Sequence, residues 1–577
     1  MTKIYSIIFF VFAVIHFAYG QTKLEKLDEL ISTYAEYGKF NGSVLVAEKG
    51  EIIYKKGFGL ANVEWGIPNQ PDTKFRLASI TKQFTAMLIV QLAAENKIKL
   101  DVPISTYLPD YPKKTADIIT IHHLLTHTSG IPSYTSFPGY REMMSDPYSP
   151  EEIVKLFVDL PLEFTPGERF NYSNSGYILL GYIIEKISGK SYEEQLHSRI
   201  FTPLKMNNSG YEHNSAVIKN KASGYDRMGN DFQHATYIDM SVPFSAGGIY
   251  STVEDLFLWD QALYTEKLLP KKYMDLLFNK CITSYGQAYY GYGWEIDETN
   301  IGNSTERVPT IGHSGGINGF STLIIRRPSE ESLIVLLSNT SGSSLGEMNV
   351  AITGILHDKT YDFPKKSIAN SLLDVIEKDG INAALLLYQK IKDSDNYYIN
   401  EFEMNTAGYQ LLQSGSTKEA AFVFKMNVEA FPNAFNTYDS YGEALLALGD
   451  TTKSIENYKK SLELNPGNEY GLKALKKLGV NTETLVKKVA IENLKLLEGE
   501  YLIANPPAGA DKNWKITFKL ENGELQGNDK GYKYRLIPVG ENKFINPDDG
   551  ASLVFNTEDK SAITLMLFGK FRFRKVI

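Results

Sequence analysis

A serine and a lysine three residues apart stand at the head of an apolar run in the segment RLASITKQFTAMLIVQLAAENKIKL. On a helix, Ser79 and Lys82 would lie one turn apart, with about 5–6 Å between their Cβ atoms, so the amine could take the hydroxyl proton. The positive end of a helix dipole also favours an oxyanion at Ser79 and disfavours the protonated form of Lys82. Because serine is a favoured helix cap, the spacing alone leaves a nucleophile and a plain cap both open.

A tyrosine and an asparagine form the second candidate group, in the segment PGERFNYSNSGY. Tyr172 and Asn174 fall in a loop that ends where another apolar-periodic helix begins. A phenol held near an ammonium loses its proton more easily and can then shuttle a proton between nucleophile and leaving group. The Asn174 amide offers donors and an acceptor to a substrate amide. Taken alone, the segment favours a packed tyrosine and a helix-capping asparagine.

The third candidate group is the run His313, Ser314, Gly315 and Gly316, directly ahead of a β-type segment. Small residues there let a substrate backbone lie against the strand edge. The Gly316 N–H could pair with that of Ser79 as an oxyanion hole. Taken alone, this run is compatible with a glycine-rich turn before a strand. The three groups in this order, at a helix start, in a loop and at a strand, are far more specific together than singly.

Two predicted hairpins enclose these groups. The first is SVLVAEKGEIIYKKGFG, which begins at Ser43, and the second is FSTLIIRRPSEESLIVLLSN, which begins at Phe320. The chain between them is mainly helical and loop-rich, and the run after Ser79 has the spacing of an amphipathic helix. We expect an α/β domain of the α+β kind, in which both ends of the segment contribute to one antiparallel sheet and the helical body is inserted between them.

The three ordered segments resemble the serine β-lactamase and penicillin-binding protein superfamily, specifically the class C-related serine hydrolases, which include S12-type peptidases. FRLASITKQFTA, ITIHHLLTHTSGIPSY, PGERFNYSNSGY and SAGGIYSTVEDLFLW carry the resemblance, over about residues 24–357. It implies a β-lactamase/transpeptidase-like fold, an antiparallel sheet flanked by helices, and an acyl-enzyme mechanism without a cofactor. It assigns attack to Ser79, proton transfer to Lys82 and Tyr172, and substrate and oxyanion binding to Asn174, His313, Ser314, Gly315 and Gly316.

The chain departs from class C β-lactamases at the third group. Those enzymes carry Lys-Thr-Gly where this chain has His313, Ser314 and Gly315, and the missing lysine supports recognition of the antibiotic's carboxylate. A histidine there is similar to the D-aminoacyl peptidases and esterases of the family. The resemblance therefore favours a D-amino-acid or peptidoglycan-type peptide as substrate, with esterase or β-lactamase activity left open.

The chain after His357 changes character twice. Two segments that begin at Thr406 and Asp439 superpose at a spacing of 34 residues, with matched glycines, a matched aromatic and a closing proline, which is the tetratricopeptide pattern. From about Asn493, about eight short β-type runs predict a small barrel or sandwich, with the last run as an edge strand. We therefore predict a signal peptide over 1–20, a hydrolase domain over 21–360, a linker and helical repeats over 361–485, and an all-β domain over 486–577.

The first twenty residues have the layout of a secretory signal, with cleavage after Gly20. This predicts a periplasmic or secreted protein with no membrane span once the signal is removed. The formal net charge is −8 and the sequence has no concentrated group of basic residues, so nucleic acid is not expected as a partner. The lone Cys281 is expected to pack as a small hydrophobe. His122, His123 and His127 lack the spacing of a zinc site, so no metal is predicted.

Two functions from different classes follow. The first is an exported serine hydrolase that acts on a small peptide, an ester or another cell-wall-derived substrate. The second is a non-catalytic module that binds a cell-wall peptide or, through the concave face of the repeats, a protein partner. The presence of Ser79, Lys82 and Tyr172 together favours the hydrolase.

Overall fold

The computed structural model describes residues 21–482, 489–504, 514–529, 531–546, 551–559, 562–567 and 569–576. The predicted signal peptide lies outside these residues. The chain divides into two compact units, the first ending at Pro364 and the second beginning at Lys365. Among the described residues, no helix is both long enough and apolar enough to cross a bilayer.

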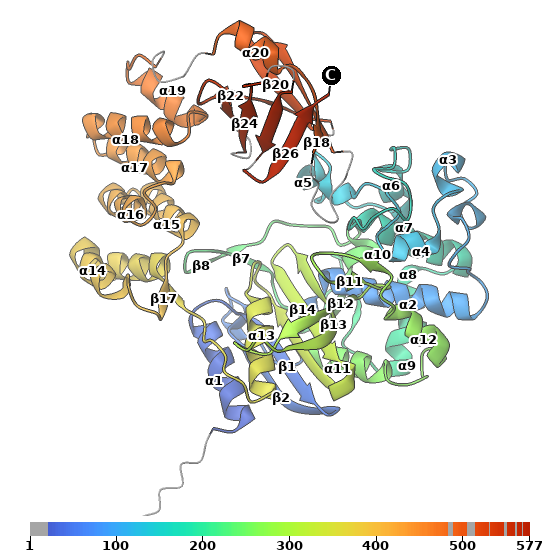
Figure 1. Ribbon diagram of the computed structural model, residues 1–577. Helices are drawn as coiled ribbons and strands as arrows, with labels where there is room; N and C mark the ends of the chain where they lie inside the picture. Colours follow the sequence, from blue (N-terminus) through green and yellow to red (C-terminus); the bar gives the residue numbers. More distant parts are fainter. Residues whose placement is uncertain are drawn as a thin grey trace, which may run out of the picture. The chain divides into compact units, whose positions relative to one another are not determined.

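The first unit is built on one antiparallel sheet in the order β10-β11-β12-β13-β14-β15-β1-β2 (Figure 1). Both predicted hairpins are present, β1 pairs with β15, and the helical body is inserted between β2 and β10, which confirms the expected sheet. The strands are β1 (Gly42–Glu48), β2 (Glu51–Phe58), β10 (Ile282–Thr283), β11 (Tyr289–Tyr290), β12 (Glu295–Asn300), β13 (Arg307–Ile317), β14 (Phe320–Arg327) and β15 (Ser332–Ser338).

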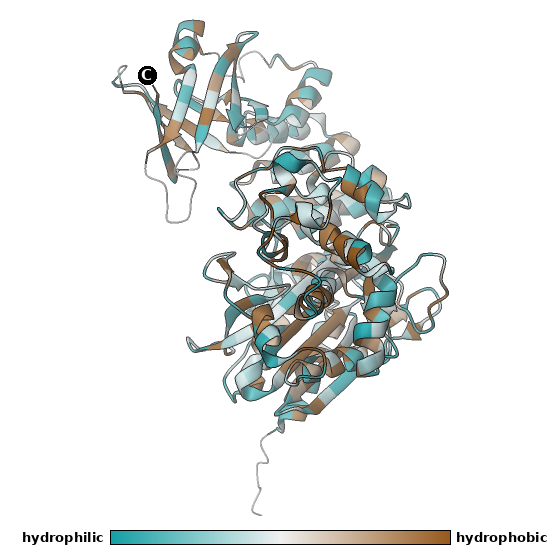
Figure 2. Cartoon of the chain, turned by 90° about the vertical axis from the view of Figure 1, so that its right-hand side faces the viewer, coloured by the Kyte–Doolittle hydropathy of each residue, from teal (hydrophilic) through white to brown (hydrophobic). Residues whose placement is uncertain are grey.

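Helices cover both faces of this sheet. Successive side chains of a strand point to opposite faces; accordingly Val44 and Val46 of β1 pack with α1 (Lys23–Glu36) and α13 (Leu345–Leu356). Leu45 and Ala47 pack on the other face, in the core that contains α2 (Thr81–Ala94) and α11 (Val253–Ala262). Both strand faces are therefore buried, and in Figure 2 the central strands and helices of this unit are mostly hydrophobic.

The inserted body consists of short helices and small sheets. Its helices are α3 (Lys113–Ala116), α4 (Ile121–Leu125), α5 (Tyr140–Met143), α6 (Pro150–Lys155), α7 (Asn174–Ser188), α8 (Tyr192–Leu196), α9 (Thr202–Leu204), α10 (Phe244–Gly247) and α12 (Lys271–Leu277). Its strands are β3 (Leu60–Asn62), β4 (Ile67–Pro68), β5 (Phe75–Arg76), β6 (Gly210–Tyr211), β7 (Tyr225–Met228), β8 (Asp231–His234) and β9 (Ile249–Ser251).

The helix that follows Ser79 is not amphipathic, contrary to the sequence prediction. Every residue of α2 from Thr81 to Ala93 is buried. Several of its polar groups find partners inside the core: the Gln83 Oε1 accepts from the Trp259 indole N–H at 3.1 Å, and the Thr85 hydroxyl donates to the Ser245 carbonyl at 2.7 Å. The positions expected to face solvent are therefore buried, because the helix is enclosed in the core that the inserted body forms with the sheet.

The second unit begins with helices. α14 (Ile368–Ile391) is kinked at Gly380 and is followed by α15 (Glu401–Gln413), α16 (Thr417–Ala430), α17 (Phe435–Ala447), α18 (Thr451–Leu464) and α19 (Glu469–Lys477). α15 and α17 start 34 residues apart, as do α16 and α18. A Cβ at Gly408 would lie 2.4 Å from the Phe424 ring, and one at Gly442 would lie 3.3 Å from the Tyr458 ring. Each glycine thus lets an aromatic residue of the next helix approach closely.

The end of the second unit is a nine-stranded sheet in the order β21-β20-β19-β18-β26-β25-β24-β23-β22, preceded by α20 (Ile491–Leu497). The terminal strands β21 and β22 are separated only by Leu536, so the sheet is a nearly closed barrel. Hydrophobic and hydrophilic residues alternate along its strands (Figure 2). They are β18 (Gly499–Ile503), β19 (Lys515–Glu521), β20 (Glu524–Asp529), β21 (Tyr532–Arg535), β22 (Ile537–Pro538), β23 (Lys543–Ile545), β24 (Ser552–Asn556), β25 (Thr564–Leu567) and β26 (Phe571–Lys575).

Two predictions for this region need correction. The last strand is not an edge strand, because β26 pairs with both β18 and β25. The helix α20 was not predicted, because its apolar residues were assigned to the β-type segments that follow it.

Candidate active site

Ser79 lies in a 3₁₀ turn, η1 (Ala78–Ile80), that leads directly into α2. It therefore precedes the α-helix rather than starting it. The residue before it, Ala78, has a φ of +50°, a left-handed conformation that is rare for a residue with a side chain. Ser79 is partly exposed whereas its neighbours Ala78 and Ile80 are buried, so the turn presents the hydroxyl at the surface of an otherwise packed segment.

Lys82 lies one turn later and is completely buried. Its Nζ is 3.0 Å from the Ser79 Oγ, 2.9 Å from the Asn174 Oδ1 and 2.9 Å from the Ala246 carbonyl oxygen. The structure thus brings the consecutive elements η1 and α2 together with α7 and α10, which lie far along the sequence from them.

Burial lowers the pKa of Lys82 to about 7. A neutral amine has two N–H groups and one lone pair, and the Asn174 Oδ1 and the Ala246 carbonyl can only accept. With both N–H groups used by these two oxygens, the lone pair of Lys82 is left for the Ser79 O–H. The arrangement is that of a general base hydrogen-bonded to its nucleophile. Desolvation, not the helix dipole named in the sequence analysis, is the cause of the shift.

Tyr172 faces the same lysine, but its ionisation differs from the prediction. The Lys82 Nζ lies 4.9 Å from the centre of the Tyr172 ring. Burial nevertheless raises the pKa of Tyr172, and the hydrogen bond with Ser79 only opposes this rise. The expected lowering by an ammonium is therefore wrong, because the lysine is itself desolvated and titrates near neutrality. Tyr172 is a phenol that can donate a proton, and Lys82 is the base.

Asn174 opens α7, and both ends of its amide have partners inside the protein. Its Oδ1 accepts from Lys82, and its Nδ2 donates to the Thr135 hydroxyl at 3.1 Å. Its backbone N–H donates to the Ser133 hydroxyl at 3.1 Å. The side chain therefore holds the Lys82 amine in place, and its second N–H is the part left for a substrate.

His313 is buried in β13 and both of its ring nitrogens have partners. Its Nδ1 lies 2.6 Å from the Ser314 carbonyl oxygen, and its Nε2 lies 2.9 Å from the Tyr290 hydroxyl. A carbonyl only accepts, so Nδ1 carries the proton and the Tyr290 O–H donates to Nε2. Burial, and next the charge of Lys82, lower the pKa of His313 to about 3. The residue that stands in place of a lysine is thus uncharged at neutral pH.

The rest of this run borders η1. The Thr322 hydroxyl donates to the Leu77 carbonyl at 2.8 Å, which ties β14 to the residue before the turn. A Cβ at Gly315 would lie 2.3 Å from the same carbonyl oxygen and 3.2 Å from the Ala78 Cβ. Ser314 and Gly316 are exposed, and a Cβ at Gly316 would meet nothing within 4 Å. Gly315 is therefore required by close packing, whereas Gly316 borders open space.

We expect Gly315→Ala to lower the melting temperature and to reduce turnover by about 100-fold, because the added methyl group must push η1 and Ser79 away from β13, and a displacement of about 1 Å costs this much. Thermal unfolding and steady-state kinetics measure both effects. The matched variant Gly316→Ala has room for its methyl group and is expected to melt with the wild type. Equal melting temperatures for the two variants would contradict this account.

Several residues of the site were missed by sequence reasoning. Ala246 contributes a carbonyl oxygen, which no residue-type pattern reveals, although its segment SAGGIYSTVEDLFLW carried part of the resemblance. Tyr290 and Thr135 had no sequence signal of their own. His127 was considered as a metal ligand and not as part of this site, but its ring centre lies 4.2 Å from that of Tyr172.

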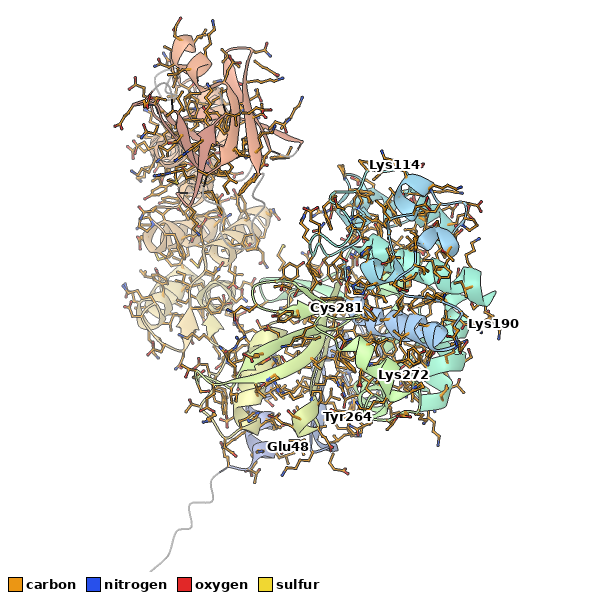
Figure 3. All side chains as sticks on the ribbon, turned by 45° about the vertical axis from the view of Figure 1, so that its right-hand side comes forward. Glu48, Lys114, Lys190, Tyr264, Lys272 and Cys281 are labelled. Carbon is orange, nitrogen blue, oxygen red and sulfur yellow. The ribbon has the colours of Figure 1, made fainter. Side chains whose placement is uncertain are left out.

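The other residues set aside have structural partners. The His123 Nδ1 accepts from the Thr120 N–H at the start of α4, and the His122 Nδ1 lies 2.8 Å from the Tyr292 hydroxyl. Cys281, labelled in Figure 3, packs against the main core of the first unit. Burial raises the pKa of its thiol to about 11, so the reactive thiolate is scarce at neutral pH.

Comparison with known proteins identifies relatives of the first unit. The family described as Beta-lactamase matches residues 27–355, more than half of the chain. Penicillin-binding protein 4* of Bacillus subtilis (strain 168) is 31% identical over 368 residues, which span 60% of this chain and 79% of that protein. Teichoic acid D-alanine hydrolase of Staphylococcus aureus (strain MRSA252) is 29% identical over 277 residues, which span 48% of this chain and 66% of that protein.

A solved structure resembles the same region. The D-amino acid amidase from Ochrobactrum anthropi SV3, complexed with L-phenylalanine, has a TM-score of 0.50 and 27% sequence identity, and the match covers 57% of this chain and 99% of that one.

Proposed function

We propose, since the chain belongs to the beta-lactamase family, that it is an exported serine hydrolase that forms an acyl-enzyme on Ser79. The observation that carries this proposal is the environment of Lys82. Its Nζ lies 3.0 Å from the Ser79 Oγ, and the Asn174 Oδ1 and the Ala246 carbonyl oxygen accept its other hydrogen bonds. A plain helix cap requires neither a buried amine nor a pKa lowered to about 7.

The first half of the reaction follows from this arrangement. The Ser79 Oγ attacks the substrate carbonyl carbon as its proton passes to the Lys82 amine, and the N–H groups of Ser79 and Gly316 are proposed to hold the oxyanion. When the bond to the leaving group breaks, Tyr172 gives its proton to that group and takes one back from Lys82. Both residues end in their starting states and the acyl group is bound to Ser79.

Water completes the cycle. It attacks the acyl carbon and loses a proton to the base, and Ser79 leaves as an alcohol with its proton restored. The balance is one ester or amide bond and one water consumed, with one acid and one alcohol or amine released.

The favoured substrate is a D-amino-acid or peptidoglycan-type peptide or ester. The relatives support this class, since they include proteins named penicillin-binding protein, teichoic acid D-alanine hydrolase and D-amino acid amidase. The neutral His313 also supports it, because a site with an uncharged residue there has no cation at that position for the carboxylate of a β-lactam. β-Lactam hydrolysis is accordingly proposed as the weaker activity.

The test is hydrolysis by a purified chain of residues 21–577, with p-nitrophenyl butyrate, the p-nitroanilides of D- and L-alanine, and nitrocefin as substrates. Turnover that depends on Ser79 and prefers the D-anilide over the L-anilide is expected. Ester turnover without anilide turnover would restrict the enzyme to an esterase. Background rates on every substrate would contradict the proposal and favour a binding protein.

The remaining parts of the chain are proposed to serve delivery and docking. Removal of residues 1–20 would release a periplasmic or secreted protein, and N-terminal sequencing of exported material should begin at Gln21. The helix pairs of the second unit, offset by 34 residues, are proposed to be tetratricopeptide repeats that dock a protein partner. We also propose that the mature chain has three domains, with boundaries at about residues 360 and 485.

A further inference from the structure

His127 is a buried histidine that the mechanism above does not use. It follows α4 in the segment LLTHTSG and is only 1% exposed. Its φ of +56° places the backbone in the left-handed region, which is uncommon for residues other than glycine, although histidine adopts it more often than most side-chain-bearing residues. Such a conformation costs about 1–3 kcal/mol and persists only where the surroundings impose it.

The contacts of His127 converge on one residue. Its carbonyl oxygen accepts from the Asn171 N–H at 2.9 Å, and its Nδ1 accepts from the Ser173 N–H at 3.1 Å. Its ring lies against the ring of Tyr172, with 4.2 Å between the centres and 33° between the planes. The two neighbours of Tyr172 and its side chain are thus all held by a single histidine.

The charge state of His127 follows from the same contacts. Because Nδ1 accepts a hydrogen bond from a backbone N–H, a neutral ring carries its proton on Nε2. The Nε2 is buried and has no hydrogen-bond partner within the described part of the chain. Burial, followed by the charges of Lys82 and His313, lowers the pKa of His127 well below its usual range. A neutral ring adds no positive charge that would compete with the protonation of Lys82.

Other rings complete the packing around His127. The Tyr290 ring centre is 4.8 Å away and the Tyr177 ring centre is 5.0 Å away. Tyr290 in turn donates to His313, so this tyrosine connects the ring of His127 to a residue of β13.

We propose that His127 is a positioning residue for Tyr172: its carbonyl and Nδ1 fix the backbone on both sides of the tyrosine, and its ring fixes the direction of the phenol toward Ser79. This inference rests on the proposed function, in which Tyr172 donates the proton to the leaving group. The left-handed backbone and the unpartnered Nε2 both destabilise the folded protein, and a turn without a functional role would not require either of them.

Two variants separate the two contributions of His127. His127→Asn keeps a side-chain acceptor and tolerates the left-handed backbone, but removes the ring. His127→Phe keeps a ring but removes the acceptor for the Ser173 N–H. We expect each to lower kcat about 10- to 100-fold with little change in KM, since His127 is too deeply buried to be reached by a substrate and a misplaced proton donor affects only the chemical step. Circular dichroism and thermal unfolding verify that each variant is folded.

A double-mutant cycle provides the decisive readout. Tyr172→Phe removes the proton donor but keeps the ring, so in that background His127→Asn is expected to cost less than about 2-fold further in kcat. A residue that only supports the fold would reduce kcat by the same factor in both backgrounds. Equal factors would overturn the inference, and so would wild-type kcat in both folded single variants.

The failure of this inference can be told apart from that of the proposed function. If the wild-type chain hydrolyses its substrates in a Ser79-dependent manner and the cycle is additive, only the role of His127 is wrong. If the wild type shows no Ser79-dependent turnover, the proposed function is wrong and the inference falls with it.

Discussion

Ser79→Ala is expected to lower kcat/KM for p-nitrophenyl butyrate by about 10⁴-fold or more, to the background rate. Loss of a serine nucleophile costs this much in other acyl-transfer enzymes, since the remaining groups bind the substrate but cannot form the covalent intermediate. The fold should survive, because Ser79 is partly exposed and the turn around it is held by contacts that do not involve the Ser79 side chain, such as the bond from the Thr322 hydroxyl to the Leu77 carbonyl. Steady-state kinetics at ester concentrations well below KM measures the loss.

The control is an exposed serine outside the site. Ser198 is exposed and donates to the Glu194 carbonyl one turn earlier, so Ser198→Ala should retain wild-type turnover. A fluorophosphonate probe adds an independent readout, since it should label the wild type and Ser198→Ala once and leave Ser79→Ala unlabelled. Turnover that persists in Ser79→Ala at more than a hundredth of the wild-type rate would mean that another nucleophile acts.

The sheet of the first unit was predictable because its signals are local. Lys49 and Gly50 both have positive φ, as a tight hairpin turn requires, and the two hairpins could be recognised from such turns and from β-branched runs. The pairing of β1 with β15 then followed, because two apolar hairpins at the ends of one domain need a common sheet.

The ionisation of the site could not be predicted in the same way. Spacing placed Ser79 and Lys82 within reach, but the direction of the Tyr172 shift depends on how deeply both groups are buried. Burial arises from the whole inserted body closing around α2, which no short motif encodes. The same holds for His313, where the sequence shows a lost lysine and only the structure shows why the histidine is neutral.

The hydrogen-bond partners of Lys82 show most clearly what a sequence motif cannot predict. Asn174 was read as a substrate ligand because its motif lies beside Tyr172, yet its Oδ1 is occupied by the lysine. Ala246 supplies only its carbonyl, which every residue type possesses. Contacts through backbone atoms and between residues about 90 or more positions apart carry no residue-type signal, so a motif can identify the base but not the groups that set its pKa.

Lys82→Met is expected to lower kcat about 10³- to 10⁴-fold, since a positioned general base contributes up to this factor. The pH dependence is a second signature. Lys82 acts as a base only when neutral, and its pKa is about 7, so wild-type kcat/KM should rise with pH through about 7 and then level off. The residual activity of Lys82→Met should lack this rise. Steady-state kinetics of both proteins between pH 5 and 9 measures the two effects, and a rise of the same shape in the variant would assign it to another group.

The same substitution has a consequence for stability whose sign follows from the pKa. The charged form of Lys82 is favoured in the unfolded chain, where its pKa is near the ordinary 10.4, and disfavoured in the folded one, where it is about 7. The difference destabilises the wild type by about 4–5 kcal/mol below pH 7, and this penalty shrinks as pH rises from about 7 to 10. Methionine has no charge to desolvate, although it leaves the Asn174 and Ala246 oxygens without their donor, which offsets part of the gain.

We therefore expect Lys82→Met to melt at a higher temperature than the wild type at pH 6, with a difference that declines toward pH 9.5. Lys114, an exposed lysine labelled in Figure 3, provides the control, and Lys114→Met should match the wild type in both kcat and melting temperature. A melting difference that stays constant with pH would show that Lys82 is not desolvated, and with it the argument that burial makes this amine a base would fail. If the folded protein is less stable with Lys82 than with a hydrophobic residue at this position, then the lysine lowers stability, as is expected of a residue that is present for catalysis rather than for folding.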